Sequence, residues 1–300
     1  MNALSVVTAL LSALSNAASL VLQRRASVDL APVPGRGLRA VITRLAQPLR
    51  RVTWWGGAMA TLLSAAFQVI ALDSGQLSVV QPLLASELLF ALLLGALVFH
   101  RRPSAALWRS FVMLAGGLAV FLIAASPSGG GDTAPGVRWL AVGVTLTALV
   151  ALLVLLALRI RGTVRAAILG AATAVCFSTT AALIKEVTRR FPDGAVAVLT
   201  TWHTYAAAFV GVLSVLLLQW TLRAGSLAGS QPALTLGDAM LSVALGVFLF
   251  GETINLGWHI VIELAGIGLM GLGVLGLAEA HVTAYDTADT PEPEPSPSRR

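Results

Sequence analysis

Charged side chains are scarce in this sequence. Only 11% of its 300 residues are Asp, Glu, Lys or Arg, whereas 57% are hydrophobic and the mean hydropathy is +0.84. Soluble proteins carry about 25% charged residues, so this composition excludes a soluble domain and predicts a membrane protein in contact with the lipid bilayer. The net charge of +6 does not indicate a nucleic-acid partner, because the cations lie in short segments between apolar runs.

Cysteine and catalytic motifs are also lacking. The single cysteine, Cys176, lies inside an apolar run and cannot form an intrachain disulfide. It has no obvious His and Asp partners, and the sequence contains neither HExxH nor GxSxG. We therefore predict that the protein is not an enzyme and uses no cofactor.

Long apolar runs are abundant instead. A run of about 20 apolar residues is long enough to cross a bilayer as a helix. The first run has no basic residues before it, unlike a secretory signal, so we expect it to be a spanning helix. The sequence predicts an all-α integral membrane protein with about nine transmembrane helices, at 3–22, 53–72, 76–99, 107–126, 137–158, 166–185, 195–218, 226–250 and 255–278.

The basic residues predict the orientation of these helices. Segment 23–52 has seven arginines and one acidic residue, so we expect a cytoplasmic loop. Alternation from that loop places 16 of the 20 Lys and Arg inside. It predicts a multi-pass protein of the plasma membrane with its N-terminus outside and its C-terminus in the cytoplasm. The Pro-rich end, 280–300, is expected to be a disordered cytoplasmic tail.

Two stretches half a chain apart resemble each other. Gln81-Pro82 and Gln231-Pro232 each lie in the first third of an apolar run, and they are separated by 150 residues. Trp108 and Trp258 have the same separation. The first four runs therefore correspond to the last four.

The unmatched fifth run decides how the two halves are related. It is a linking helix at 137–158, between a first half (1–136) and a second half (159–279). Because this one helix makes the offset odd, the second half enters the membrane from the opposite side. Inverted repeats of this kind are typical of alternating-access carriers, which bind substrate near the middle of the bilayer.

The two prolines interrupt their helices chemically. Pro82 and Pro232 each remove a backbone hydrogen bond and free a carbonyl one turn earlier. In lipid such a carbonyl needs a hydrogen-bond partner. If the helix is broken and lines a pathway, the partner is substrate or water; if the proline only kinks the helix, the partner is a group on a neighbouring helix. Both interpretations stay open, and Gln81 and Gln231 are substrate-binding candidates in the first.

Two carboxylates lie near the middle of these same runs. Glu87 and Asp238 are functional candidates because acids within the bilayer are costly. Their roles would be cation ligand, and hence a metal site, or proton carrier; a hydrogen-bonded packing group is the structural alternative. Asp238 shares one helix face with Gln231, Thr235 and Ser242, since these residues recur at i, i+4, i+7 and i+11.

Polar stripes also mark the first two runs. Ser and Thr allow close helix packing, so we interpret these hydroxyls first as packing groups that support a pathway. The stripes comprise Thr8, Ser12, Ser15 and Ser19 in the first run, and Thr61, Ser64 and Gln68 in the second. Gln68 is the substrate-binding candidate among them.

Four more ionisable residues lie in or beside apolar runs. His259 and Glu263 stand one helical turn apart and suit proton coupling, although a structural pair is equally consistent with the spacing. His203 is expected to be a satisfied packing histidine. Lys185 is expected to snorkel at the outer end of its helix.

These motifs resemble the drug/metabolite transporter superfamily. The resemblance covers roughly residues 1–279 and rests on the segments 81–84 and 231–234, and on the run 245–250 followed by Gly251-Glu252. It implies EamA-like duplicated halves. Nine runs, an outside N-terminus, a basic first loop and Trp54-Trp55-Gly56 look most similar to the branch that contains NIPA-type magnesium transporters.

The sequence therefore supports three functions. The first is a secondary transporter that moves a small metabolite or drug by alternating access, with proton coupling as an option. The second is a divalent-cation transporter of the NIPA type, in which Glu87 and Asp238 would bind Mg²⁺. The third is a non-transporting membrane scaffold. The sequence leaves a homodimer open.

Overall fold

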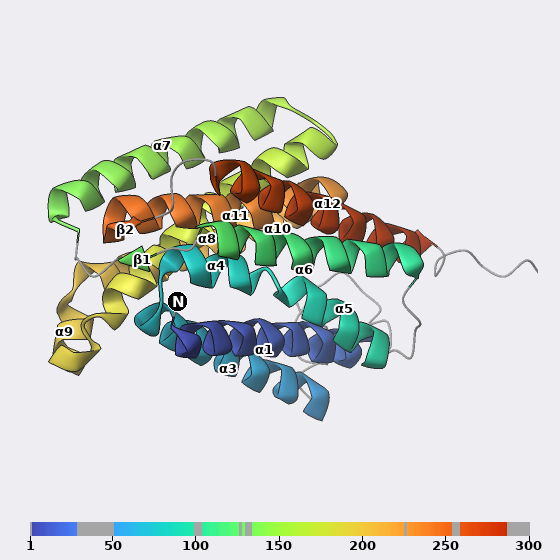
Figure 1. Ribbon diagram of the computed structural model, residues 1–300, viewed down its shortest axis with the longest axis horizontal. Helices are drawn as coiled ribbons and strands as arrows, with labels where there is room; N and C mark the ends of the chain where they lie inside the picture. Colours follow the sequence, from blue (N-terminus) through green and yellow to red (C-terminus); the bar gives the residue numbers. More distant parts are fainter. Residues whose placement is uncertain are drawn as a thin grey trace, which may run out of the picture.

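A computed structural model describes residues 2–28, 51–98, 104–125, 128–129, 134–224, 227–253 and 259–286. Most of its helices run side by side along the long axis of the molecule (Figure 1). In chain order the elements are α1 (Ala3–Val28), α3 (Val52–Ser74), α4 (Leu77–Leu84), α5 (Glu87–Val98), α6 (Ala105–Ala125), β1 (Ser128–Gly129), α7 (Gly136–Arg159), α8 (Thr163–Thr188), the 3-10 helix η2 (Phe191–Asp193), α9 (Ala195–Thr200), α10 (Trp202–Ala224), α11 (Leu227–Phe250), β2 (Glu252–Thr253) and α12 (His259–Asp286).

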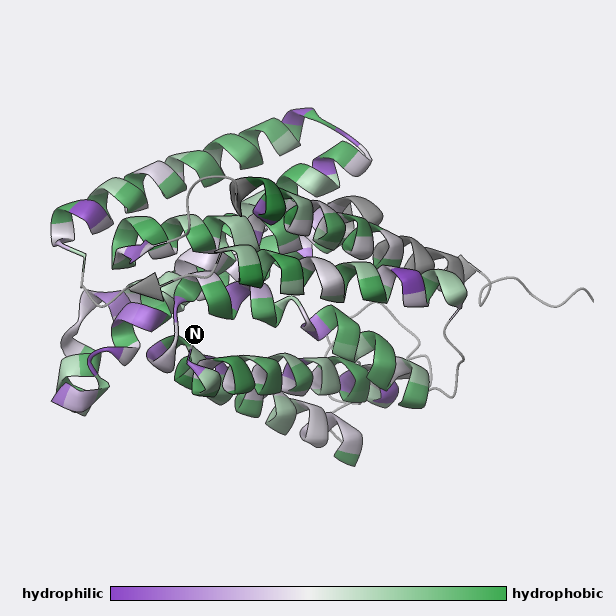
Figure 2. Cartoon of the chain, in the orientation of Figure 1, coloured by the Kyte–Doolittle hydropathy of each residue, from purple (hydrophilic) through white to green (hydrophobic). Residues whose placement is uncertain are grey.

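Eight membrane-length helices within the described ranges make the chain an all-α multi-pass membrane protein. They are α1, α3, the joined segment Leu77–Val98 that contains α4 and α5, α6, α7, α8, α10 and α11. Figure 2 shows hydrophobic residues along most of their length. The 28-residue α12 contains a shorter apolar stretch, Val261–Leu277.

The structure corrects the start of one predicted span and extends the ends of two others. The run 195–218 is not one helix, because Thr201 has an extended backbone between α9 and α10. The spanning helix begins at Trp202, seven residues later than predicted. Residues 280–286, expected in the tail, are the last residues of α12, and residues 23–28, expected in the basic loop, are the last residues of α1. Most of the predicted basic loop, residues 29–50, and the tail 287–300 lie outside the described residues.

A short β-ladder was not predicted from the sequence. The antiparallel strands β1 and β2 pair Ser128 with Thr253 and Gly129 with Glu252. This ladder joins the end of α6 to the end of α11, at the end of the bundle where α8 also ends and α4 begins (Figure 1).

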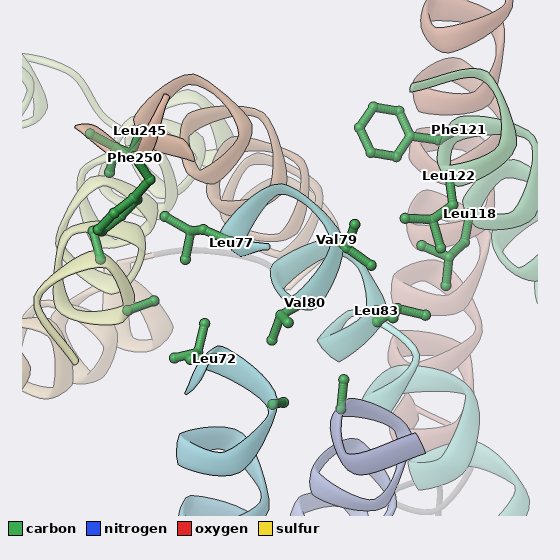
Figure 3. Close-up of a cluster of buried hydrophobic side chains, with 14 of the residues drawn as sticks. Leu72, Leu77, Val79, Val80, Leu83, Leu118, Phe121, Leu122, Leu245 and Phe250 are labelled. Atoms are coloured by element: carbon green, nitrogen blue, oxygen red, sulfur yellow. The ribbon is translucent and has the colours of Figure 1, made fainter. Parts of the chain in front are cut away.

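Helix α4 lies at the centre of the bundle. All residues from Leu77 to Leu83 are buried. Figure 3 shows Leu77 on the side of Phe250 and Val79 on the opposite side, toward Leu118. Helix α4 therefore packs between α11 and α6, which belong to different halves of the sequence.

Glycines permit the closest helix contact, between α6 and α12. A Cβ atom on Gly273 would lie 2.5 Å from the backbone nitrogen of Leu114, and one on Gly117 would lie 2.7 Å from the carbonyl oxygen of Gly266. Small residues at such crossings allow two backbones to approach each other within a membrane.

Candidate functional site

The predicted third span is broken between α4 and α5. Ala85 and Ser86 separate the two helices, three residues after Pro82. The backbone N–H groups of Ala85 and Ser86 donate to Pro82 and Leu83 at 3.1 Å and 3.0 Å, and the Ser86 hydroxyl also donates to Leu83 at 2.6 Å. These i to i+3 bonds satisfy the carbonyls of Pro82 and Leu83 at the break. The break is therefore stabilised by hydrogen bonds within the protein, as buried backbone in a membrane requires.

Glu87 lies directly after this break. It is the first residue of α5, where the helix dipole favours a negative charge. Its half-buried carboxylate also interacts with the side chain of Asn16 on α1. Gln81, by contrast, is buried on α4 before the break.

The second Gln-Pro helix differs from the first. Helix α11 is continuous through Pro232, so a proline alone does not break a helix in this bundle. Gln231 is half-buried and Thr235 is buried on the same helix. The two Gln-Pro helices thus differ in backbone as well as in the position of their carboxylate.

Asp238 has an oxygen without a protein partner. Within the described ranges, the buried Oδ1 of Asp238 has no partner within ordinary hydrogen-bond geometry, and the only side chain that interacts with this carboxylate is the Ser242 hydroxyl, one turn later on the same helix. Burying a polar group without a hydrogen bond is costly, and more so in a helix that crosses a bilayer. A proton, water, ion or substrate would lower this cost, so Asp238 has the properties of a binding or coupling group.

The other predicted site residues are dispersed. Gln68 is half-buried on α3, and Glu263 is half-buried on α12, one turn after His259, the first residue of that helix. The side chain of His259 lies outside the described part. Among the described side chains, Glu87 and Asp238 are in no group of three or more His, Cys, Asp or Glu that could hold a metal ion.

Hydroxyl stripes hold helix pairs together in both halves. The hydroxyl oxygens of Ser12 on α1 and Ser64 on α3 lie 3.1 Å apart. Each hydroxyl also lies 2.9 Å from the backbone carbonyl oxygen of the other serine, to which it can donate. Ser19 and Thr61 make a second contact at 2.6 Å, seven residues further along α1. In the other half, α8 and α10 are joined by Thr173 with Thr221 and by Thr180 with Ser214.

His203 packs against aromatic rings but is only partly satisfied, because its buried Nε2 has no hydrogen-bond partner among the described residues. Its Nδ1 lies 2.8 Å from the hydroxyl of Thr201, and its ring stacks on Trp202 at 3.9 Å between centroids. The hydroxyl contact joins Thr201, whose backbone is extended, to the first turn of α10.

Lys185 does not snorkel, which corrects the prediction. Its side chain is only 4% exposed, and its Nζ lies 3.0 Å from Oε1 of Glu252, whose side chain is 0% exposed. Lys185 also donates a hydrogen bond to the carbonyl of Gly75, just after α3. The prediction failed because the partner lies 67 residues away in the sequence.

Glu252 caps the N-terminus of α4. Its Oε1 accepts from the backbone N–H of Leu77 at 2.7 Å, and its Oε2 accepts from the N–H and hydroxyl of Ser78 at 3.0 Å and 2.6 Å. The N-cap residue itself, Gln76, makes no side-chain cap. Glu252 therefore provides both the cap and a negative charge at the positive end of the helix dipole.

Two sequence signals mark this ion pair in retrospect. Lys185 is the only lysine, since the other 19 basic residues of the chain are arginines. It also lies within an apolar helix, where a charge indicates a specific partner. On the other side, Gly251 has a φ of +62°, which turns the chain after α11 so that Glu252 faces back toward α4.

Comparison with known proteins gives one relative. A Corynebacterium glutamicum protein described as uncharacterized is 28% identical over 293 residues, which cover 97% of each chain. No family model matches the chain, and no solved structure matches it. The similarity extends over nearly the full length of both proteins, and the relative's description names no activity.

Proposed function

We propose that the protein is a secondary transporter of the drug/metabolite type, which moves a small molecule by alternating access and couples this movement to protons through Asp238. The observation that carries the proposal is the buried, unpartnered Oδ1 of Asp238 on a bilayer-length helix. Helix α11, which bears it, packs directly against α4, the first segment of the broken helix. A scaffold would gain nothing from so costly a group.

The pattern of helix packing supports two inverted halves with α12 as the ninth span. Helix α4 packs against its repeat partner α11, and α6 packs against its repeat partner α12. Equivalent helices meet each other only near an axis that relates the two halves. The paired hydroxyl contacts between α1 and α3, and between α8 and α10, are a further similarity between the halves.

The depth of the two carboxylates supports a site near the middle of the membrane. Asp238 lies 12 residues before Phe250, the end of α11, which corresponds to about 18 Å of helix. Glu87 lies just beyond α4, whose eight residues from Leu77 rise about 12 Å, and beyond the two-residue break that follows it. Both distances are near half of a hydrocarbon core about 30 Å thick.

In this mechanism Asp238 binds a proton when the passage is open to one side and releases it when the passage is open to the other. The neutral acid tolerates the closed, dry passage better than the carboxylate does, because burial disfavours charge. The hydroxyls of Ser242 and Thr235 on the same helix face are then available to the proton-bearing group or to substrate. The N-terminus would lie outside and the C-terminus in the cytoplasm of the plasma membrane.

The test measures proton movement driven by candidate substrates. Purified protein in liposomes that contain a pH-sensitive dye is challenged with a panel of amino acids, organic cations and drugs. A compound that drives proton flux in wild type should drive none in Asp238→Asn, while Asp193→Asn, which alters an exposed residue of η2, keeps the flux. Equal flux in wild type and Asp238→Asn would remove Asp238 from the mechanism.

A further inference from the structure

The ion pair of Lys185 and Glu252 connects the two halves of the chain. Both charged residues belong to the second half, at the end of α8 and in β2. Every group that they bind across the interface, namely the Gly75 carbonyl and the N–H and hydroxyl groups of Leu77 and Ser78, belongs to the first half. This contact therefore joins the halves at one end of the bundle.

The surroundings of the pair leave the Glu252 carboxylate two positions, one buried beside Lys185 and one in water. Lys185 and Glu252 are both buried, and the Phe250 ring lies 5.2 Å from the Lys185 ammonium. Leaving one buried charge without its partner is strongly unfavourable, so the carboxylate either stays in place or moves to a position where water enters. Gly251 precedes Glu252 and has a left-handed backbone conformation. It therefore provides a turn directly before Glu252, the residue that would have to move.

The Glu252 carboxylate lies against Gly246 of α11, on the side of this helix that bears Asp238. Gly246 faces the Glu252 carboxylate, since a Cβ atom at this position would overlap Oε2 and would lie 3.5 Å from the Ser78 nitrogen. Ser242 and Asp238 precede Gly246 by four and eight residues, so they follow on the same side of the helix, within about 80°. A passage opened at Glu252 would therefore lead along α11 to Ser242 and then to Asp238.

We infer that Lys185 and Glu252 form a latch that closes this end of the passage between the halves. The structure shows the closed state, in which Glu252 occupies the N-terminus of α4. Opening requires the carboxylate to leave Leu77 and Ser78, whose donors then face water. The role of this opening as a step of the transport cycle rests on the proposed function; the opening itself does not.

The experiment uses a cysteine reporter on α11, one turn further into the bundle than the latch. Ser242→Cys is nearly isosteric, and Ser242 is 0% exposed. In a Cys176→Ala background, full-length protein in lipid nanodiscs is labelled with a charged maleimide. The natural Cys176, buried in α8, is labelled in a separate sample with Ser242 intact and reports general unfolding.

Three variants are compared in both samples. Glu252→Gln removes the charge of the latch, and the double variant Lys185→Met/Glu252→Gln leaves no unpaired charge, so it folds even if the single variant does not. Glu186→Gln is the matched control, because Glu186 is a neighbouring carboxylate that is 1% exposed and pairs with Arg190 rather than with α4.

We expect both latch variants to raise the labelling rate of the Ser242→Cys reporter at least about tenfold, through a larger open population. Glu186→Gln should leave it unchanged, and Cys176 should stay protected throughout. An unchanged reporter in the double variant would overturn the latch, as would an equal rise at Cys176 or in Glu186→Gln. Because labelling needs no transport, a failed latch leaves the proton-flux test of Asp238 standing.

Discussion

Ser78 and Glu252 are separated by 174 residues in the sequence, yet Ser78 donates both its backbone N–H and its hydroxyl to the Glu252 carboxylate, at 3.0 Å and 2.6 Å. The second half of the chain thereby caps the central helix of the first half. This relationship fixes where α4 begins, and it makes the stability of the bundle depend on a single carboxylate.

Removing that carboxylate should destabilise the protein strongly. Glu252→Ala leaves the Lys185 ammonium buried and unpaired and exposes the donors at the start of α4, so we expect a loss of about 3–5 kcal/mol in the free energy of unfolding. The double variant Lys185→Met/Glu252→Ala should lose less, because it buries no lone charge. Chemical unfolding in detergent micelles measures both; a double variant as unstable as Glu252→Ala would contradict a lone-charge effect.

Arginine should not replace the only lysine. The Lys185 ammonium is a compact charge that reaches both the Gly75 carbonyl and Glu252 within a packed end of the bundle. A planar guanidinium at this buried position requires neighbouring groups to move, so we expect Lys185→Arg to lose about 1–3 kcal/mol although it keeps the charge. Arg189→Lys, at the residue that follows the end of α8, is the comparison, and the same unfolding assay gives the result.

Gly246 should tolerate no side chain. Even the methyl group of Gly246→Ala would overlap the Glu252 carboxylate and push it away from α4. We expect a loss of about 1–3 kcal/mol from overpacking, with faster labelling of the Ser242→Cys reporter. Gly95→Ala is the matched control, since a Cβ atom there meets nothing within 4 Å. Equal effects of the two substitutions would show that Gly246 matters only as a helical glycine.

The hydroxyl pair between α1 and α3 should contribute modestly. Ser12 and Ser64 bind each other, so their interaction appears in a double-mutant cycle of Ser12→Ala, Ser64→Ala and the double variant. We expect a coupling of about 0.5–1 kcal/mol, typical of hydrogen bonds between membrane helices. Additive effects in thermal or chemical unfolding would instead make these serines important for close packing alone.

The sequence predicts what depends on hydropathy and misses what depends on tertiary contact. Apolar length located the spans because a helix needs a minimum length to cross a bilayer. The same criterion joined α9 to α10, because an extended Thr201 changes the backbone without changing hydropathy.

The candidate site divides in the same way. Asp238 was found because an acid in an apolar run stands out, and its helix face follows from spacing. The Lys185–Glu252 pair was missed because its three segments meet only in the folded bundle, at separations of 67 to 175 residues. The available signals were the composition, with one lysine among 20 basic residues, and the place of that lysine within an apolar helix.

The orientation of the latch can be checked without a substrate. If segment 23–52 is cytoplasmic, then alternation places the start of α4, the end of α8 and β2 on the outer side. A reporter enzyme fused at residue 40 should then be active only in the cytoplasm, and a tag inserted after Asp193, an exposed residue of η2, should be reached from outside intact cells. A tag after Asp193 that is reached only from the cytoplasm, together with a reporter at residue 40 that is outside, would reverse the orientation, so the latch would close the inner end of the passage. Reporters at residues 40 and 193 on the same side would instead break the alternation itself, and with it the inverted repeat on which the proposed transport mechanism depends.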